Sequence, residues 1–475
     1  RRKKALSGNI QWNMKQILQA ILFYFSRIII RRYKPVIIAV TGSVGKTSAK
    51  EAIYTVLKTK FRVRKSEFNY NNEIGVPLAI FGLPHPGRNI FRWFALFLLV
   101  IADALVKNKS FPEMLILEMG VDRPGDMKHL IACAPPLVGV ITEIGEIPVH
   151  VEFFSGPKEV ADEKANIIKF LPIEGFAVLN ADDEVLDDMP KKTKAHALRF
   201  GFSDDADLKI TNFELSAGYD ETLKKEIPRG VHFKIEYQGK VIPVKLPDVF
   251  GKPAAYAAAV GALVGLIFKM NLIEISSALL GYVPPPGRLR LLRGIKNSFI
   301  LDDTYNSSPE ALHAALDTLR DLPGKRKIAV LGDMLELGTY SEGAHRAAGD
   351  MVSEIADALL TVGARAKFIA DEAMVGSRFA RERSDWLQTQ SNEAFPAELG
   401  GLENKKVMDK KYVSTFDRSE DAGKALQDII QEGDLILVKG SQGIRMERVV
   451  EEIMAEPEKA GKLLVRQSAY WKGKF

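Results

Sequence analysis

The chain has 475 residues, of which 46% are hydrophobic and 27% are charged. This length is too great for one hydrophobic core, so we expect two or three domains, and the composition excludes collagen-like and disordered chains. The 66 Lys and Arg residues exceed the 60 Asp and Glu residues too little for a general nucleic-acid-binding surface. The single cysteine, Cys133, excludes an internal disulfide and a multi-cysteine zinc site.

Basic residues concentrate in the first 34 positions, on both sides of an apolar stretch at residues 17–30. The stretch is shorter than the about 20 residues that cross a membrane, and no signal-peptide cleavage site is evident. We therefore expect residues 1–35 to form an interfacial helix near anionic lipid. A second apolar stretch, residues 91–102, lies in an expected insertion at about 88–110. For both stretches, burial against the protein and peripheral membrane contact remain open.

A β-branched run at residues 36–40 is followed by a glycine-rich loop and then by a predicted helix at residues 48–60. The loop is Thr41-Gly42-Ser43-Val44-Gly45-Lys46-Thr47. Strand, loop and helix in this order are typical of a phosphate-binding loop, whose backbone N–H groups cradle phosphate oxygens. Lys46 would supply charge to the β and γ phosphates, and the Thr47 hydroxyl would bind Mg²⁺. Val40 stands where a complete Walker A motif has glycine.

Further strands are predicted at residues 114–117, 138–141 and 177–179, with helices between them. Short strands at 209–213, 231–237 and 240–246 predict an antiparallel excursion, followed by an Ala-rich helix at 256–266. The run Pro284-Pro285-Pro286-Gly287 predicts a hinge, and strands at 299–301, 327–331, 358–362 and 435–438 follow it. The expected fold is α/β: a central P-loop ATPase domain with a mostly parallel sheet at 36–287, then a Rossmann-like C-terminal domain at 288–475.

Seven segments, in this order along the chain, together resemble the Mur ligases, which build the peptide of bacterial peptidoglycan. They are the phosphate loop and residues 69–78, 117–120, 180–183, 302–310, 332–338 and 438–441. The Asn-rich segment 69–78 is similar to that of the branch that adds D-Ala-D-Ala. The resemblance implies that ATP phosphorylates a carboxylate and that an amine then attacks the acyl phosphate. The acceptor would be a muramoyl tripeptide and the amine D-Ala-D-Ala.

The resemblance also implies roles for individual residues. Lys46, Lys164 and His150 would be catalytic, with Lys164 carbamoylated. Thr47, Glu118 and His150 would hold Mg²⁺, two ions in all, although His150 comes two residues later than the family spacing. The residues expected at ATP are Gly42, Ser43, Val44, Gly45, Lys46, Thr47, Ser48, Tyr256, Arg288 and Asp303. Those expected at the acceptor and the amine are Asn71, Asn72, Asn306 and Lys439.

Two departures from the family pattern keep alternatives open. The two asparagines that the family places near adenine are absent from residues 252–256, where Tyr256 could stack on the base. About 40 residues precede the phosphate loop, fewer than the family's usual acceptor-binding domain. The alternatives are ligation of another amine to a lipid-linked acceptor, and a membrane-associated nucleotide-binding protein without ligase turnover. We expect a cytoplasmic monomer, associated with the inner face of the membrane, that binds no nucleic acid.

Overall fold

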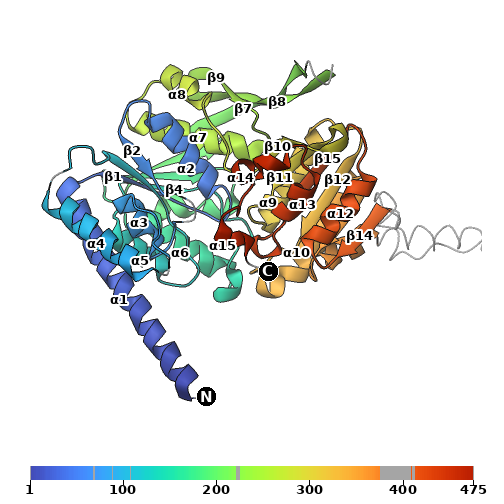
Figure 1. Ribbon diagram of the computed structural model, residues 1–475. Helices are drawn as coiled ribbons and strands as arrows, with labels where there is room; N and C mark the ends of the chain where they lie inside the picture. Colours follow the sequence, from blue (N-terminus) through green and yellow to red (C-terminus); the bar gives the residue numbers. More distant parts are fainter. Residues whose placement is uncertain are drawn as a thin grey trace, which may run out of the picture.

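In a computed structural model, the chain folds around two separate β-sheets with helices packed on them (Figure 1). The structure describes residues 2–67, 70–87, 89–106, 108–220, 225–374, 408 and 412–473. Asn69, which begins the Asn-rich segment, and residues 88 and 107 of the expected insertion lie outside the described residues. Both sheets are mostly parallel, which confirms the predicted α/β class.

The first sheet has the order β2-β3-β1-β4-β5-β6-β7-β8-β9. All pairings from β2 to β7 are parallel, and β7, β8 and β9 pair antiparallel. The strands are β1 (Val36–Thr41), β2 (Val63–Lys65), β3 (Met114–Glu118), β4 (Val138–Ile141), β5 (Phe176–Asn180), β6 (His196–Gly201), β7 (Leu208–Asp220), β8 (Lys225–Tyr237) and β9 (Lys240–Pro247).

Both faces of this sheet are covered because successive strand residues point to opposite sides. Ile38 and Val40 of β1 pack with α2, α7 and α8, whereas Ile37 and Ala39 pack on the face of α1, α3, α4, α5 and α6. The helices are α1 (Arg2–Tyr33), α2 (Lys46–Leu57), α3 (Gly75–Phe81), α4 (Ile90–Leu105), α5 (Asp126–Cys133), α6 (Pro157–Lys169), α7 (Lys252–Ile267) and α8 (Leu272–Leu279).

The two apolar stretches form the helices α1 and α4, which pack against each other. The rings of Phe25 and Phe97 lie 5.9 Å apart, and the Tyr33 hydroxyl donates to the Asp103 carbonyl at 3.0 Å. Leu22 and Ile29 of α1 and Leu96 of α4 are buried in the core of the first sheet. Each helix is therefore partly a core element. Among the described residues, no helix combines the length and the apolar character needed to cross a membrane.

The antiparallel excursion is larger than expected from the sequence. β7 and β8 are each 13 residues long, so the prediction of short strands there was wrong. The pairing runs from Leu208–Tyr237 to Asp220–Lys225 and passes through two irregularities. The strands continue past their apolar residues because they are held by hydrogen bonds between their backbones. Such pairing does not require buried side chains, so the apolar pattern in the sequence does not mark the ends of these strands.

The second sheet has the order β10-β11-β15-β12-β13-β14, and among these described strands only β10 is antiparallel to its neighbour. Helices α9 and α10 cover one face, and α12, α13 and α14 cover the other. The strands are β10 (Arg290–Arg293), β11 (Phe299–Asp303), β12 (Lys327–Gly332), β13 (Ala358–Val362), β14 (Val413–Phe416) and β15 (Leu435–Lys439). The helices are α9 (Pro309–Asp321), α10 (Ser341–Ile355), α12 (Ser419–Ile429), α13 (Glu447–Ile453), α14 (Ala460–Leu463) and α15 (Ala469–Lys472).

Candidate functional site

The glycine-rich loop joins the carboxyl end of β1 to the first turn of α2. Gly42 lies against Thr142, and a Cβ added at Gly42 would come within 2.2 Å of the Thr142 Oγ1 atom. Gly45 precedes α2 with a φ of 84°, which favours glycine. The two glycines thus allow a tight turn between β1 and α2, and the amino end of α2 faces the carboxyl edge of the sheet. Such a helix end attracts anions.

Two backbone amides of this loop are held by the segment that follows β4. The N–H groups of Ser43 and Val44 donate to the Glu143 carbonyl at 2.5 and 3.3 Å. The Thr142 hydroxyl donates to the carbonyls of Thr41 and Val44. Loop 41–47 and residues 142–143 therefore form one structural unit. Ser48 follows in α2, and its carbonyl accepts from the Tyr282 hydroxyl at 3.5 Å.

Glu118, at the end of β3, lies among polar groups of α2. Its carboxylate accepts from the Thr47 hydroxyl at 3.1 Å and lies 3.4 Å from the Lys50 amine, with both charged side chains almost fully buried. Burial opposes ionisation, but Lys50, Lys46 and Arg288 together hold the pKa of Glu118 below its usual value. A hydroxyl beside an ionised strand-end carboxylate is a donor set that suits Mg²⁺. The sequence had not indicated Lys50.

The two asparagines expected at the acceptor have different roles in this structure. The Asn71 amide donates to Glu118 at 3.4 Å, which brings Asn71 to the edge of the site. The Asn72 side chain accepts from the backbone N–H groups of Ile74 and Gly75 at 3.2 and 2.9 Å. Asn72 therefore stabilises the start of α3.

Two buried amines approach the phosphate loop. Lys46 Nζ donates to the carbonyls of Gly42 and Ser43 at 2.7 and 3.3 Å, and Lys164 Nζ donates to the Ser43 hydroxyl at 2.9 Å. Burial lowers the pKa of Lys46, although Glu118 partly opposes this. Burial, with the nearby Lys46 charge, lowers the pKa of Lys164 well below its usual range. The structure thus brings Lys46, Lys164 and Ser43 together.

His150 lies where the half of the chain that carries the first sheet meets the half that carries the second sheet. Its Nδ1 atom is 2.7 Å from Glu336, and its Nε2 atom is 3.6 Å from Asp122. Within the described ranges, no group of three His, Cys, Asp or Glu side chains converges as a metal site. Thr47 and Glu118 are adjacent to each other, whereas the contacts of His150 are with Asp122 and Glu336.

An acidic cluster missed by sequence reasoning lies beside the loop. Burial and the carboxylates of Asp183, Glu310 and Asp182 raise the pKa of Glu143 to about 7. Asp183 accepts from the Ile144 N–H at 2.6 Å, and Glu310 of α9 accepts from the Ile147 N–H at 3.1 Å. Segments 180–183 and 302–310, two of the resembling motifs, thus meet at residues 143–147. Their spacing in sequence gave no indication of this meeting.

Arg288 enters the site from the segment after the proline hinge. Its guanidinium lies 4.1 Å from the centre of the Tyr305 ring, and its Nε atom is buried with no hydrogen-bond partner among the described residues. The positive charge of Arg288 lies close enough to Lys46, Glu118 and Lys439 to lower the pKa of each of them. A buried, unpartnered guanidinium nitrogen beside a phosphate loop fits an anionic ligand such as a phosphate group.

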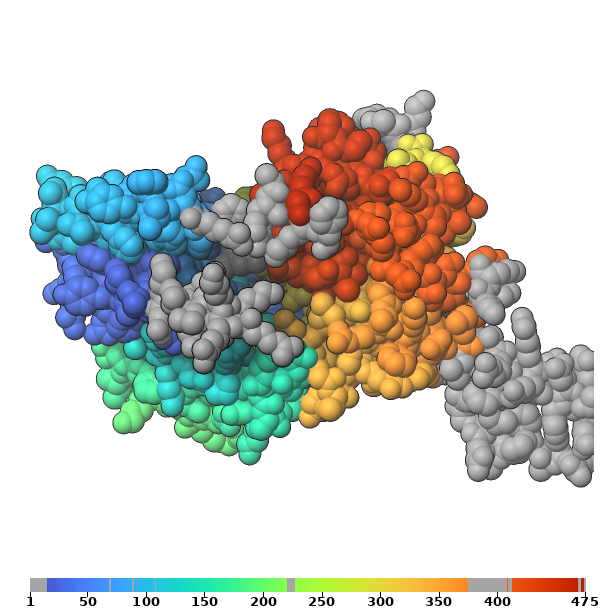
Figure 2. Space-filling model, turned by 60° about the horizontal axis from the view of Figure 1, so that its bottom comes forward, coloured from blue at the N-terminus to red at the C-terminus, as the bar shows by residue number. Residues whose placement is uncertain are grey.

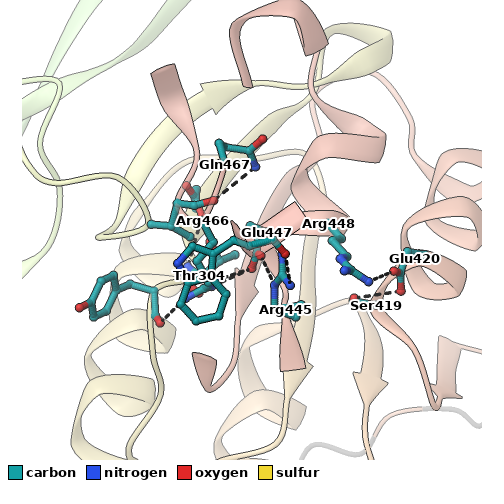
Figure 3. A network of polar contacts seen from close by, with 12 residues as sticks. Thr304, Ser419, Glu420, Arg445, Glu447, Arg448, Arg466 and Gln467 are labelled. Atoms are coloured by element: carbon teal, nitrogen blue, oxygen red, sulfur yellow. Dashed lines mark hydrogen bonds and ion pairs between the residues drawn. The ribbon is translucent and has the colours of Figure 1, made fainter. Parts of the chain in front are cut away.

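A network of arginines holds the Thr304–Tyr305 segment in place (Figure 3). Arg466 donates to the Tyr305 carbonyl at 2.9 Å, to the Thr304 carbonyl, and to Glu447 at 2.7 Å. Arg445 donates to the other oxygen of Glu447 at 2.6 Å. These contacts fix the position of Tyr305, and the Tyr305 ring in turn supports Arg288.

Asp303 and Lys439 form a buried ion pair at the carboxyl ends of β11 and β15. Lys439 Nζ lies 2.5 Å from Asp303 and donates to the Asn306 carbonyl at 3.0 Å. Asn306 borders a pocket of about 400 Å³ between the two halves of the chain. Its lining residues are His150, Asn306, Leu335, Glu336, Ser441, Gln442, Gly443, Arg445 and Trp471.

Tyr256, in the first turns of α7, is hydrogen-bonded to the 180–183 segment. Its hydroxyl donates to Asp182 at 2.8 Å, and burial together with Asp182 raises its pKa. The Phe202 ring meets the Tyr256 ring edge-on at 5.4 Å. The hydroxyl and the ring of Tyr256 are therefore both held by residues of the first half of the chain.

Two family models match the chain in consecutive stretches. Residues 40–91 and 99–245 match the Mur ligase middle domain, and residues 287–442 match the Mur ligase glutamate ligase domain. The chain belongs to the Mur ligase family. Its predicted enzyme class, an ATP-dependent ligase that forms ADP, is thereby confirmed. Neither model matches residues 1–39 or 92–98, so α1 and the middle of α4 lie outside them.

Individual relatives point to one branch of the family. The chain is 28% identical over 424 residues to the UDP-N-acetylmuramoyl-tripeptide–D-alanyl-D-alanine ligase of Bacillus subtilis (strain 168), covering 89% of this chain and 76% of that protein. The enzyme of the same name from Escherichia coli (strain K12) is 26% identical over 348 residues, covering 72% and 68%.

Solved structures agree with this assignment. The MurF ligase of Thermotoga maritima in complex with ADP aligns with a TM-score of 0.68 at 27% identity, covering 93% of this chain and 84% of that one. MurF from Acinetobacter baumannii aligns with a TM-score of 0.70 at 21% identity, covering 91% and 80%, and shares the fold.

Proposed function

We propose that the chain adds D-Ala-D-Ala to a UDP-linked muramoyl tripeptide, at the expense of ATP, during peptidoglycan precursor synthesis. The similarity to enzymes of that name supports the choice of substrates. The observation that carries the proposal is the convergence of Lys46, Glu118 and Lys164 on one phosphate loop. Binding a nucleotide alone would not need all three.

The proposed division of labour follows from the contacts. The amino end of α2 and Lys46 would hold the β and γ phosphates, and Arg288 would bind phosphate from the other half of the chain. Mg²⁺ bound by Thr47 and Glu118 would neutralise the charge that builds on the phosphoryl oxygens. The pocket around Asn306 and Ser441 would receive the incoming amine, since it opens beside His150 and both halves of the chain.

The test is to measure ADP formation with ATP, UDP-N-acetylmuramoyl tripeptide and D-Ala-D-Ala, omitting each in turn. We expect ADP to form only when both the acceptor and the dipeptide are present, with the ligated product seen by mass spectrometry. Lys46→Ala should slow ADP formation at least about 100-fold, since a phosphoryl-binding cation is lost. Lys191→Ala, whose side chain is 80% exposed, is the matched control. Basal ATP hydrolysis indifferent to both substrates would overturn the proposal.

The same experiment separates the alternatives. A ligase that acts on another amine would form ADP with the acceptor and a panel of amino acids but not with D-Ala-D-Ala. A lipid-linked acceptor would replace the UDP-linked one in detergent or vesicles. A nucleotide-binding protein without ligase turnover would bind ATP and form no product with any of them.

We also propose that Lys164 is carbamoylated. The neutral amine attacks CO₂, an N–C bond forms, one proton leaves, and the lysine becomes an anion that can help to hold Mg²⁺. The lowered pKa of Lys164 supports this, because only the neutral amine reacts. A carbamate signal from ¹³C-bicarbonate in the wild type, absent in Lys164→Ala, is the expected NMR result. Activity of Lys164→Ala equal to that of the wild type would argue against the modification.

For location, we propose the cytoplasm, at the inner face of the membrane, and we propose a monomer. The proposed substrates, ATP and a nucleotide-linked sugar peptide, are cytoplasmic molecules. Light scattering at micromolar protein concentration would test the monomer, and a dimer would contradict it.

A further inference from the structure

Helix α4 exposes an unusually apolar surface. Ile90, Phe91, Phe94, Leu98 and Leu105 are 69, 81, 66, 52 and 74% exposed. Residues three and four positions apart are neighbours on a helix, so these side chains form one continuous stripe along the 16 residues of α4. Single exposed apolar residues are ordinary on a protein surface, whereas a continuous patch marks an interaction site.

Helix α1 continues the patch. Ile17, Ile21 and Tyr24 are 58, 38 and 64% exposed, at positions that recur on one side of the helix. Residue numbers rise together along the contacts Phe25–Phe97 and Tyr33–Asp103, so α1 and α4 run side by side in the same direction. Figure 2 shows the two helices adjacent at the end of the molecule farthest from the second sheet. We call the exposed apolar residues of the two helices the α1–α4 face: Ile17, Ile21, Tyr24, Ile90, Phe91, Phe94, Leu98 and Leu105.

The charges around the α1–α4 face are positive, with the exception of Asp103. The sequence has no acidic residue before Glu51, and Asp103 is the sole acidic residue between positions 84 and 112. Lys15, Arg31 and Lys34 of the α1 region and Arg92 and Lys109 around α4 are exposed. An apolar stripe flanked by Lys and Arg is complementary to a surface that is apolar inside and anionic outside.

We propose that the α1–α4 face docks the protein on the surface of an anionic lipid bilayer. At about 1.5 Å per residue, α4 is about 24 Å long, shorter than the about 30 Å hydrocarbon core, so it lies in the interface. Its buried residues Leu96 and Val100 hold it on the protein while Phe91, Phe94 and Leu98 enter the acyl boundary. The inference does not depend on which amine or acceptor the enzyme uses.

The helices of the α1–α4 face point their amino halves toward the carboxyl edge of the first sheet. Phe23 of α1 contacts His129, and Arg27 donates to the Ala132 carbonyl at 2.5 Å, so contacts move toward the start of α5 as α1 is followed toward its amino end. The start of α5 lies at the carboxyl edge of the sheet, where the phosphate loop also lies. The amino halves of α1 and α4 therefore extend toward the edge that carries Glu118 and His150.

The test is flotation of the 475-residue chain with vesicles of neutral phosphatidylcholine and with vesicles that also contain anionic phosphatidylglycerol. We expect at least about tenfold more protein on the anionic vesicles, with the difference shrinking as salt is raised. Phe91→Glu/Leu98→Glu should lower this binding at least about tenfold. Ile173→Glu/Ile273→Glu is the matched control, because these isoleucines are 72 and 74% exposed elsewhere on the surface.

Thermal unfolding checks that both double variants fold like the wild type. No vesicle binding by the wild type would overturn the proposal. Equal binding to both kinds of vesicle would overturn its anionic component, and equal binding by Phe91→Glu/Leu98→Glu would overturn its placement on α4. Light scattering separates a further outcome. If the wild type binds no vesicles and forms a dimer, and Phe91→Glu/Leu98→Glu is a monomer, the α1–α4 face is an interface with a second copy of the chain.

Discussion

At the scale of single residues, the site depends on buried charges that neutralise one another. Glu118 was predictable because it ends an apolar strand and lies in a segment that resembles the Mur ligases. Lys50 was not, since a lysine one helical turn after Lys46 resembles a solvent-exposed residue in sequence. Only the fold shows that Lys50 is 1% exposed and reaches Glu118 at 3.4 Å. A sequence shows which residues are charged, but it does not show which of them are buried in the folded protein.

Replacing Lys50 should destabilise the protein strongly. Lys50→Met would leave the Glu118 carboxylate buried with less compensation, at a cost of about 3 kcal/mol in the free energy of unfolding. Urea denaturation of Lys50→Met, Glu118→Gln and the double variant measures the coupling between the two residues. We expect the double variant to recover most of the loss. A cost below about 1 kcal/mol for Lys50→Met would mean that the pair is not buried as described.

Glu143 should make the stability of the protein depend on pH. Its folded pKa of about 7 is above the usual 4.5, so the folded state binds more protons than the unfolded state between these values. The contribution of Glu143 is therefore present at low pH and declines as pH rises from about 4.5 to about 7, by up to about 3 kcal/mol. Unfolding free energies of the wild type and Glu143→Gln across this range are the measurement. An identical slope in both would contradict the prediction.

At the scale of helices and strands, the sequence predicted the central strands well and missed several edge strands. β1, β3, β4 and β5 are apolar runs, because parallel strands are covered on both faces. The sequence did not predict four strands: β2, β6, β10 and β14. They are strands because their backbones pair with a neighbour, and they lack a long apolar run. The helix α7 was expected from its Ala and Gly content, and its partner is α2.

Close packing of α2 on α7 should make Gly261 irreplaceable. A Cβ at this position would lie 3.0 Å from the Ala52 backbone. Gly261→Val should therefore separate the helices and cost about 1–3 kcal/mol in unfolding free energy. Gly343→Ala, in α10 with no atom near its added Cβ, is the control and should gain up to about 1 kcal/mol. Equal effects of the two changes would refute tight packing at Gly261.

At the scale of the whole molecule, the site is completed by groups from both sides of residue 287. Arg288 and Glu310 come from the C-terminal half, and the phosphate loop and residues 143–147 come from the first half. The resemblance to Mur ligases predicted that Arg288 and the phosphate loop belong to one site. It did not predict the contacts of Glu310 or the contact of His150 with Glu336, because such contacts depend on how the loops of the two sheets meet.

A side chain at Gly145 should disturb this junction. The added Cβ would come within 2.3 Å of Glu310 Cδ and displace the carboxylate from the Ile147 N–H. Gly145→Ala should therefore speed hydrogen exchange at the Ile147 amide at least about tenfold. Gly125→Ala is the matched control, because Gly125 also has a positive φ but no atom near its added Cβ. Unchanged exchange at Ile147 in Gly145→Ala would contradict the described junction.

The two residues Lys34 and Pro35 are the whole connection between α1 and β1. Proline fixes its own φ, and so short a link has no slack. β1 lies inside the sheet between β3 and β4 and ends at the phosphate loop. The short link and the pairing of β1 with β3 and β4 therefore tie the position of Gly42 to that of α1. If the α1–α4 face rests on a bilayer as proposed, the bilayer would therefore also set the position of β1 and of the phosphate loop at its end.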